Sequence, residues 1–241
     1  MNMKRSVCCL ILFSFLGISI AMAQEPEKER HWVWELYGGA NNYMTWEVET
    51  GVVYKPWRFI GVGAGLLFTP QIDDDNVYSG DARDKKLHWR IEENDLAYLM
   101  AFRSGIYLYS PSVYLDHDRD VALSFRVSPG ITVPLPPNSS AVVNYVPVDA
   151  VIDVPVTSGR VSNSQARACY YHVRFAVALE MERLSVLLGY TTSDYDLYGG
   201  SRNMVVEGQK IGLPHKKQTG TFFIGLTCDF RAYKKKTLPR A

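Results

Sequence analysis

Residues 170–180 read Tyr-Tyr-His-Val-Arg-Phe-Ala-Val-Ala-Leu-Glu, and this stretch decides the fold. The odd-numbered positions from Tyr171 to Leu179 are all large and apolar, whereas the even-numbered positions from His172 to Glu180 are polar, charged or small. Successive side chains of a β-strand point to opposite faces, so a period of two predicts a strand with one apolar face. No window of similar length shows the i, i+3, i+4 stripe of a helix.

The same alternation recurs in seven other stretches of the chain. They are residues 32–36, 46–55, 60–69, 97–108, 121–128, 184–190 and 222–230. Several of these stretches approach the ~9–11 residues that a strand needs to cross a bilayer, whereas strands of ordinary globular proteins average ~5–6. Strand length is therefore the first indication that these strands face lipid.

The connections between the predicted strands differ in length in a regular way. Residues 55–57 and 181–183 form short links, and residues 109–120 form a moderate one. Residues 70–95, 134–165 and 193–219 form long polar connections, with a brief turn at 41–45 as the exception. Short turns at one end and long loops at the other are typical of outer-membrane barrels, in which the short turns are periplasmic. An even number of strands then places both mature termini in the periplasm.

The two faces of the predicted strands differ in chemistry. Bulky apolar side chains fill one face, and the opposite face carries small residues and charges. In a membrane barrel the polar face lines the lumen, and an Arg placed outward near the bilayer midplane would cost about 2–4 kcal/mol. We therefore predict a lumen charge network that plugs the barrel, with a transport path as the alternative. Its members are Glu35, Glu47, Glu49, Arg103, Arg126 and Arg174.

Aromatic residues concentrate near the predicted strand ends. Amphipathic rings at such positions are typical of the girdles that lie at headgroup level on both sides of a membrane barrel. Core packing in a soluble β-sandwich is the alternative. The predicted girdle consists of Trp32, Trp34, Trp46, Tyr54, Trp57 and Tyr190, with Phe230 beside it.

The N-terminus reads as a secretory signal peptide spanning residues 1–23. Lys4 and Arg5 precede an apolar run from 7 to 22, and Ala21-Met22-Ala23 provides a small-x-small cleavage site before Gln24. Removal of this segment leaves 24 basic and 25 acidic residues. A balanced charge argues against a nucleic-acid partner, which requires a basic surplus. The mature chain then comprises a barrel at 24–230 and a short basic periplasmic tail at 231–241.

The chain resembles the small eight-stranded outer-membrane barrels of Gram-negative bacteria, of the OmpA transmembrane-domain, OmpX and OmpW kind, and the porin-family barrels common in Bacteroidota. The signal peptide, the alternating strands and the last strand, Phe223 to Phe230, carry this resemblance. That strand is similar to the signal read by the barrel-assembly machinery, with Gly225 at the third place and Phe230 at the eighth. The resemblance implies outer-membrane lipid and lipopolysaccharide as surroundings, the assembly machinery as a partner in biogenesis, and a monomer.

The sequence indicates no catalytic site, metal site or cofactor. The five histidines are scattered without the spacing of metal ligands, and a structural His172 in the lumen is the favoured interpretation. An acidic loop containing Asp73, Asp74 and Asp75 is expected to be solvated, with Ca²⁺ binding as the alternative.

Two local features yield further expectations. Cys169 and Cys228 are predicted to lie on outward faces of strands two steps apart, too far for a disulfide bond. Pro129 lacks an N–H group, so we expect a bulge there or an end to lipid-facing pairing near Val127, with the remainder projecting beyond the bilayer.

The sequence thus predicts an all-β fold, an eight-stranded antiparallel up-and-down transmembrane β-barrel of the bacterial outer membrane. Its expected role is structural, adhesive or minor transport, without enzymatic activity. Two alternatives remain open: a soluble secreted or periplasmic β-barrel or sandwich that binds an apolar ligand, and an outer-membrane lipid-modifying enzyme.

Overall fold

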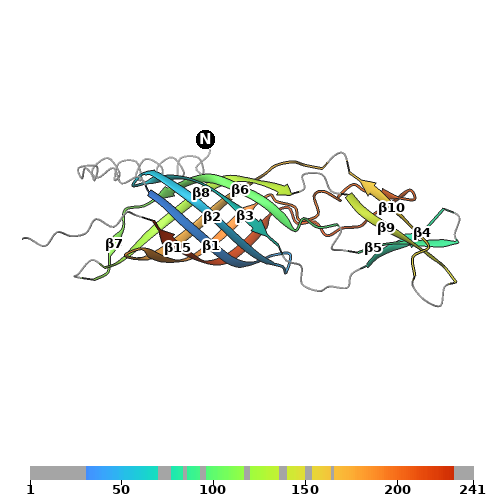
Figure 1. Cartoon of the computed structure of the whole chain (residues 1–241), viewed down its shortest axis with the longest axis horizontal. Helices are drawn as coiled ribbons and strands as arrows, with labels where there is room; N and C mark the ends of the chain where they lie inside the picture. The colour runs from blue at the N-terminus through green and yellow to red at the C-terminus, as the bar shows by residue number, and fades with distance from the viewer. Residues whose placement is uncertain are drawn as a thin grey trace, which may run out of the picture.

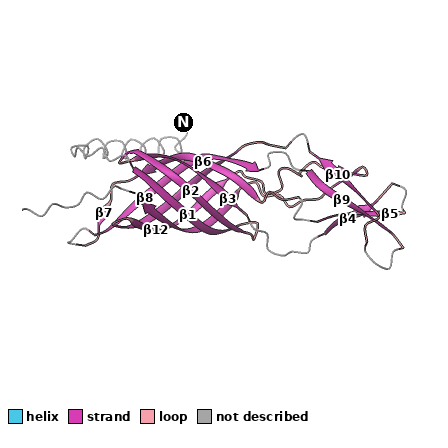
Figure 2. Ribbon diagram, in the orientation of Figure 1, coloured by secondary structure: helices cyan, strands magenta, loops and turns pink. Residues whose placement is uncertain are grey.

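The computed structural model describes residues 31–69, 77–83, 86–92, 96–116, 120–135, 140–149, 154–163 and 166–230. The predicted signal peptide at 1–23, the basic tail at 231–241 and the acidic run at Asp73, Asp74 and Asp75 lie outside these described residues. The described part of the chain consists of strands and connections, as Figure 2 shows. Within it, no helix is long and apolar enough to cross a membrane.

Eight strands form one closed barrel, drawn in the left half of Figure 1. Each pairs antiparallel with its neighbour along the chain, and the last pairs with the first. The predicted eight-stranded antiparallel up-and-down barrel is therefore confirmed. The barrel strands are β1 (His31–Asn41), β2 (Trp46–Trp57), β3 (Ile60–Phe68), β6 (Met100–Tyr109), β8 (Val121–Leu135), β11 (Tyr170–Met181), β12 (Leu184–Ser193) and β15 (Thr219–Asp229).

The two ends of the barrel differ as the sequence predicts. At one end, here called the turn end, lie residues 58–59 and 182–183, the link 110–120, the start of β1 and the end of β15. The two-residue strand β7 (Val113–Tyr114) in that link pairs with the start of β8. At the other end, here called the loop end, lie the three long connections and the brief turn at 42–45.

The long connections are more ordered than the sequence suggests. The first two contribute two strands each to a second, four-stranded sheet, here called the appendage sheet, which extends beyond the loop end (Figure 1). Its order is β10 (Thr157–Ser162), β9 (Ser140–Pro147), β5 (Leu87–Glu92) and β4 (Val77–Asp81). The third connection carries a small hairpin of β13 (Val205–Val206) and β14 (Gln209–Lys210).

A buried apolar cluster joins the appendage sheet to the barrel. Leu67 and Ala101 of the barrel belong to the same cluster as Trp89 and Val143 of the appendage sheet. The third connection adds, among others, Tyr195, Leu197, Tyr198, Met204 and Ile211. The mouth of the barrel at the loop end is therefore covered by packed side chains.

The expectation for Pro129 is wrong. Strand β8 continues through Pro129 to Leu135, and its register with β11 is unbroken from Tyr170 opposite Thr132 to Met181 opposite Val121. Pairing between β8 and β6 stops at Gly105 opposite Gly130 and resumes at Leu108 opposite Val127. The effect of the missing N–H group falls on the β6 side alone, so pairing on the β11 side keeps the strand intact.

Candidate functional site

The lumen holds all six charged residues that the sequence singled out. Each lies on the inward face of its strand and is buried, from Glu35 at 1% exposure to Arg126 at 6%. Burial of this many charges requires partners, since an unpaired charge in a dry interior is strongly unfavourable.

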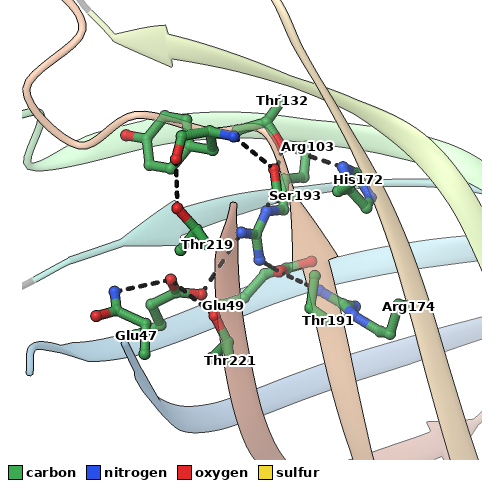
Figure 3. Close-up of polar contacts among 12 residues, drawn as sticks. Glu47, Glu49, Arg103, Thr132, His172, Arg174, Thr191, Ser193, Thr219 and Thr221 are labelled. Carbon is green, nitrogen blue, oxygen red and sulfur yellow. Dashed lines mark hydrogen bonds and ion pairs between the residues drawn. The ribbon is translucent and has the colours of Figure 1, made fainter. Parts of the chain in front are cut away.

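Four of the six form one cluster toward the loop end, shown in Figure 3. Glu49 on β2 lies between two arginines, and both donate to its Oε2 atom: Arg103 Nη1 at 2.9 Å and Arg174 Nη2 at 2.5 Å. Arg103 also forms an ion pair with Glu47, with 3.5 Å between Nη2 and Oε2. The cluster joins strands β2, β6 and β11 across the lumen.

Neutral polar side chains occupy the remaining hydrogen-bonding positions of this cluster. Asn41 Nδ2 donates to Glu47 Oε1 at 3.0 Å, and the Thr221 hydroxyl donates to the same oxygen at 3.1 Å. Arg103 Nε lies 3.4 Å from Thr132 Oγ1, and Arg174 Nε makes the equivalent contact with Thr191. These contacts fix the orientation of both carboxylates and both guanidinium groups.

The other two charged residues, Glu35 and Arg126, lie toward the turn end. They are joined there by Glu180, which the sequence did not single out. Arg126 pairs with Glu35 at 3.7 Å and with Glu180 at 3.6 Å. Glu180 also accepts hydrogen bonds from Ser124 at 2.5 Å and from Ser112 at 2.9 Å. Glu180 lies on the inward face of residues 170–180, so the alternation in that stretch could have identified it.

Aromatic rings fill much of the remaining lumen. Arg174 lies over the ring of Tyr37, 4.2 Å from its centroid, and over Phe223 at 5.2 Å. These rings fit because glycines face them: a Cβ atom at Gly225 would lie 2.4 Å from Tyr37, and one at Gly189 would lie 2.4 Å from Phe223. The inward glycines therefore make room for large neighbours on adjacent strands.

The packed lumen leaves almost no open volume beside the charge cluster. The cavity lined by Glu47, Glu49, Arg103 and Arg174 measures about 10 Å³, which is about the room that one water molecule needs. An eight-stranded barrel is just wide enough for its own side chains to fill it.

His172 lies on the inward face of β11 and is buried. Its Nδ1 atom lies 3.0 Å from the Thr132 hydroxyl (Figure 3), and its ring lies against the backbone of Gly130. Thr132 and Gly130 therefore fix the position of the His172 ring in the lumen.

The outward face of the barrel is apolar and exposed on every strand. Leu188 is 67% exposed, and Ile224 is 62% exposed. One large exposed apolar residue from each of the eight strands illustrates the band: Trp34, Val52, Val62, Ile106, Phe125, Phe175, Leu188 and Ile224. A soluble barrel would have the opposite distribution, with apolar side chains inside and polar ones outside.

The residues of the predicted aromatic girdle separate into two groups. Those near the turn end are Trp32, Trp34, Tyr54 and Trp57, and those toward the loop end are Trp46 and Tyr190. Neighbouring rings contact one another, with 4.9 Å between the centroids of Trp32 and Tyr54 and 4.7 Å between Tyr190 and Phe222. Phe230, which follows β15, is exposed, and its backbone N–H donates to the carbonyl of Trp32.

A cluster of three polar side chains, Arg202, Asp196 and Tyr43, stabilises the third connection at the loop end and is here called the polar lock. Arg202 donates two hydrogen bonds to Asp196, at 2.8 and 2.5 Å, and two more to the carbonyls of Leu213 and Pro214. The Tyr43 hydroxyl donates to Asp196 at 3.2 Å. Burial, together with the nearby carboxylate of Asp196, raises the pKa of Tyr43 to about 12, so its hydroxyl remains a donor at neutral pH.

Cys169 and Cys228 are both free, as predicted. They are kept apart mainly along the barrel axis and not by two strand steps, as the sequence predicted. Cys169 immediately precedes β11 at the loop end, whereas Cys228 lies near the turn end of β15. Among the residues that the structure describes, no three His, Cys, Asp or Glu side chains are grouped so that they could hold a metal ion.

Among solved structures, the chain is similar to several outer-membrane proteins. The N-terminal β-barrel domain of Pseudomonas aeruginosa OprF aligns with a TM-score of 0.41 and 7% identity over 85% of this chain and 100% of that one. Ail, the attachment invasion locus protein of Yersinia pestis, aligns with a TM-score of 0.37 and 9% identity over 85% and 100%.

A major outer membrane protein from Thermus thermophilus aligns with a TM-score of 0.37 and 12% identity over 83% of this chain and 99% of that one. No family model matches the sequence, and no curated protein matches it.

Proposed function

We propose that this chain is an integral outer-membrane barrel with a closed lumen, which holds the appendage sheet outside the cell in a structural or adhesive role. The exposed apolar band that encircles all eight strands carries this proposal. A soluble monomer rarely exposes a contiguous apolar surface of more than a few hundred Å², whereas a bilayer covers such a band completely.

The closed lumen argues against an open pore as the main function. The charge cluster around Glu49 and the small volume of the cavity beside it, about 10 Å³, support this part of the proposal. Refolded protein in a planar lipid bilayer should therefore show no large steady openings. Such openings in the unmodified chain would contradict the closed lumen.

We infer the orientation of the barrel from its two ends. Short turns and both chain ends face the periplasm in outer-membrane barrels, so the loop end and the appendage sheet face outward. In this proposal Gly225 and Phe230 belong to the segment that the barrel-assembly machinery reads, and lipopolysaccharide surrounds the outer half of the barrel. The appendage sheet favours an adhesive role, since it presents a folded surface beyond the membrane.

Cell fractionation combined with cysteine labelling tests location and orientation. Cys169 and Cys228 are first replaced by serine, and a single cysteine is then placed in the appendage sheet (Ser158→Cys) or in a turn-end link (Arg58→Cys). We expect both variants in the washed outer-membrane fraction. A membrane-impermeant thiol reagent should label Ser158→Cys in intact cells and Arg58→Cys only after lysis.

Recovery of the chain in the soluble periplasm would refute the membrane location. Labelling of Arg58→Cys alone in intact cells would reverse the orientation.

A further inference from the structure

The outer wall of the barrel contains one groove within the apolar band. It is a shallow, open groove that crosses β3, β6, β8 and β11 and has a volume of about 510 Å³. Its outward-facing residues are Val62, Ser104, Ile106, Pro129, Ile131, Tyr171 and Val173. The groove spans three steps between neighbouring strands, about 14 Å at ~4.8 Å per step.

Two local features create this groove. Ser104 has a small side chain on the outward face and is only half-buried, and its partner on β3 is the equally small Ala64. Beside it the recorded pairing of β6 and β8 is interrupted opposite Pro129. The wall is therefore lower here than on the adjoining parts of the same strands.

The lining of the groove is suited to a hydrocarbon chain. Val62, Ile106 and Ile131 are all exposed and aliphatic, at 55%, 51% and 38%. The groove also runs diagonally, because Val62 lies near the turn end of β3 whereas Tyr171 lies at the loop end of β11. A ligand in it would therefore extend from the interior of the apolar band toward its outer edge.

Polar groups gather at the outer edge of the groove. Tyr171 is 67% exposed, and the guanidinium of Arg167 lies 6.0 Å from the centre of its ring. Arg167 pairs with Asp194 at 2.7 Å, yet about half of its side chain remains exposed. A half-exposed guanidinium beside an exposed phenol offers hydrogen-bond donors to a phosphate group.

We propose that this groove binds one acyl chain of a phosphorylated glycolipid of the outer leaflet, with the phosphate near Arg167 and Tyr171. This inference rests on the proposed function, which places the loop end and the outer edge of the groove in the outer leaflet. Continuity of the groove with the lipid-facing band accounts for the acyl chain, and the charge of Arg167 accounts for the phosphate.

Retention of lipid by the full-length barrel tests the proposal. The chain is refolded in vesicles of phosphatidylethanolamine containing lipid A, extracted in mild detergent, and examined by native mass spectrometry. We expect one retained lipid A per barrel. Ser104→Leu should abolish retention because it fills the groove while remaining compatible with a lipid-facing position.

Matched variants separate the groove from general effects. Gly38→Leu adds the same side chain at an outward position on β1, where a Cβ atom meets nothing within 4 Å, and it should retain lipid A. Arg167→Ala should lose most of the retained lipid A, and Arg167→Lys should restore part of it.

Equal retention by Ser104→Leu and the unmodified chain would overturn the proposal, as would equal retention of phosphatidylethanolamine and lipid A. Gel mobility of unheated samples checks folding in the same vesicles. A barrel that folds in vesicles but retains no lipid A refutes this inference alone, whereas failure to enter the vesicles refutes the proposed function as well.

Discussion

Replacement of Glu49 by glutamine removes the carboxylate on which the lumen cluster converges. In the native chain this group accepts hydrogen bonds from both Arg103 and Arg174. In Glu49→Gln two buried guanidinium groups face a neutral amide, and Glu47 remains near Arg103 alone at 3.5 Å. Breaking a buried ion pair by removal of one partner costs about 3–5 kcal/mol, so we expect Glu49→Gln to lower the free energy of unfolding by an amount near the upper end of that range.

Arg174→Met should be less destabilising than Glu49→Gln. Glu49 then keeps its hydrogen bond to Arg103 at 2.9 Å, and the methionine side chain can still pack against Tyr37 and Phe223. We expect Arg174→Met to lower the free energy of unfolding by about 3 kcal/mol, the lower end of the range. The double variant should lose less than the sum of the two single losses, because the residues share one contact.

Urea unfolding in lipid vesicles, followed by tryptophan fluorescence, measures these differences. Arg83→Met is a matched control, since Arg83 is 80% exposed and lies 3.9 Å from Glu207. An exposed pair of this kind contributes at most about 1 kcal/mol. The account of the lumen would be refuted if Glu49→Gln lost no more stability than Arg83→Met, or if the two lumen losses were strictly additive.

Three further changes probe other parts of the molecule. Gly189→Ala should destabilise the barrel by about 1–3 kcal/mol, because the new Cβ atom would lie 2.3 Å from a neighbouring backbone oxygen. At Gly38 a Cβ atom meets nothing within 4 Å, so Gly38→Ala should be close to neutral in the same urea assay. Leu188→Arg should cost about 2–4 kcal/mol in vesicles if the outward face contacts lipid, and an unchanged unfolding midpoint would argue against that contact. Asp196→Asn removes the ion pair with Arg202, so limited proteolysis should cleave residues 194–218 faster while the barrel itself stays resistant; equal cleavage rates would show that the lock is dispensable.

The barrel could be predicted because alternation is a local property of each strand. In residues 170–180 every second side chain is apolar, and the same parity places Arg174 and Glu180 on the inward face. Pairing between strands then follows from the up-and-down order. The partner of each charge does not follow from parity, which is why Glu180 was missed as a partner of Arg126.

The appendage sheet could not be predicted in the same way. Strands β4 and β10 are short, rich in small or polar residues, and contain no fully buried residue, so they show no clear apolar face. Their sheet is stabilised instead through Trp89 and Val143, which belong to one buried apolar cluster with residues of the third connection. Contacts between segments so far apart in the sequence leave no periodic signal in any one of them.

The wrong expectation at Pro129 has a similar origin. A proline removes one hydrogen bond, and the sequence does not show which neighbouring strand loses it. In the barrel the interruption falls on β6, and the unbroken register with β11 continues the strand to Leu135.

The central claim is that the exposed apolar band of the barrel is covered by lipid, and gel mobility tests it most directly. Purified, unfolded chain is mixed with lipid vesicles or with buffer alone, and each sample is run unheated and boiled. We predict a heat-modifiable band that appears only with vesicles and that resists protease in the barrel region. A folded, monodisperse monomer formed in buffer without lipid would contradict the account.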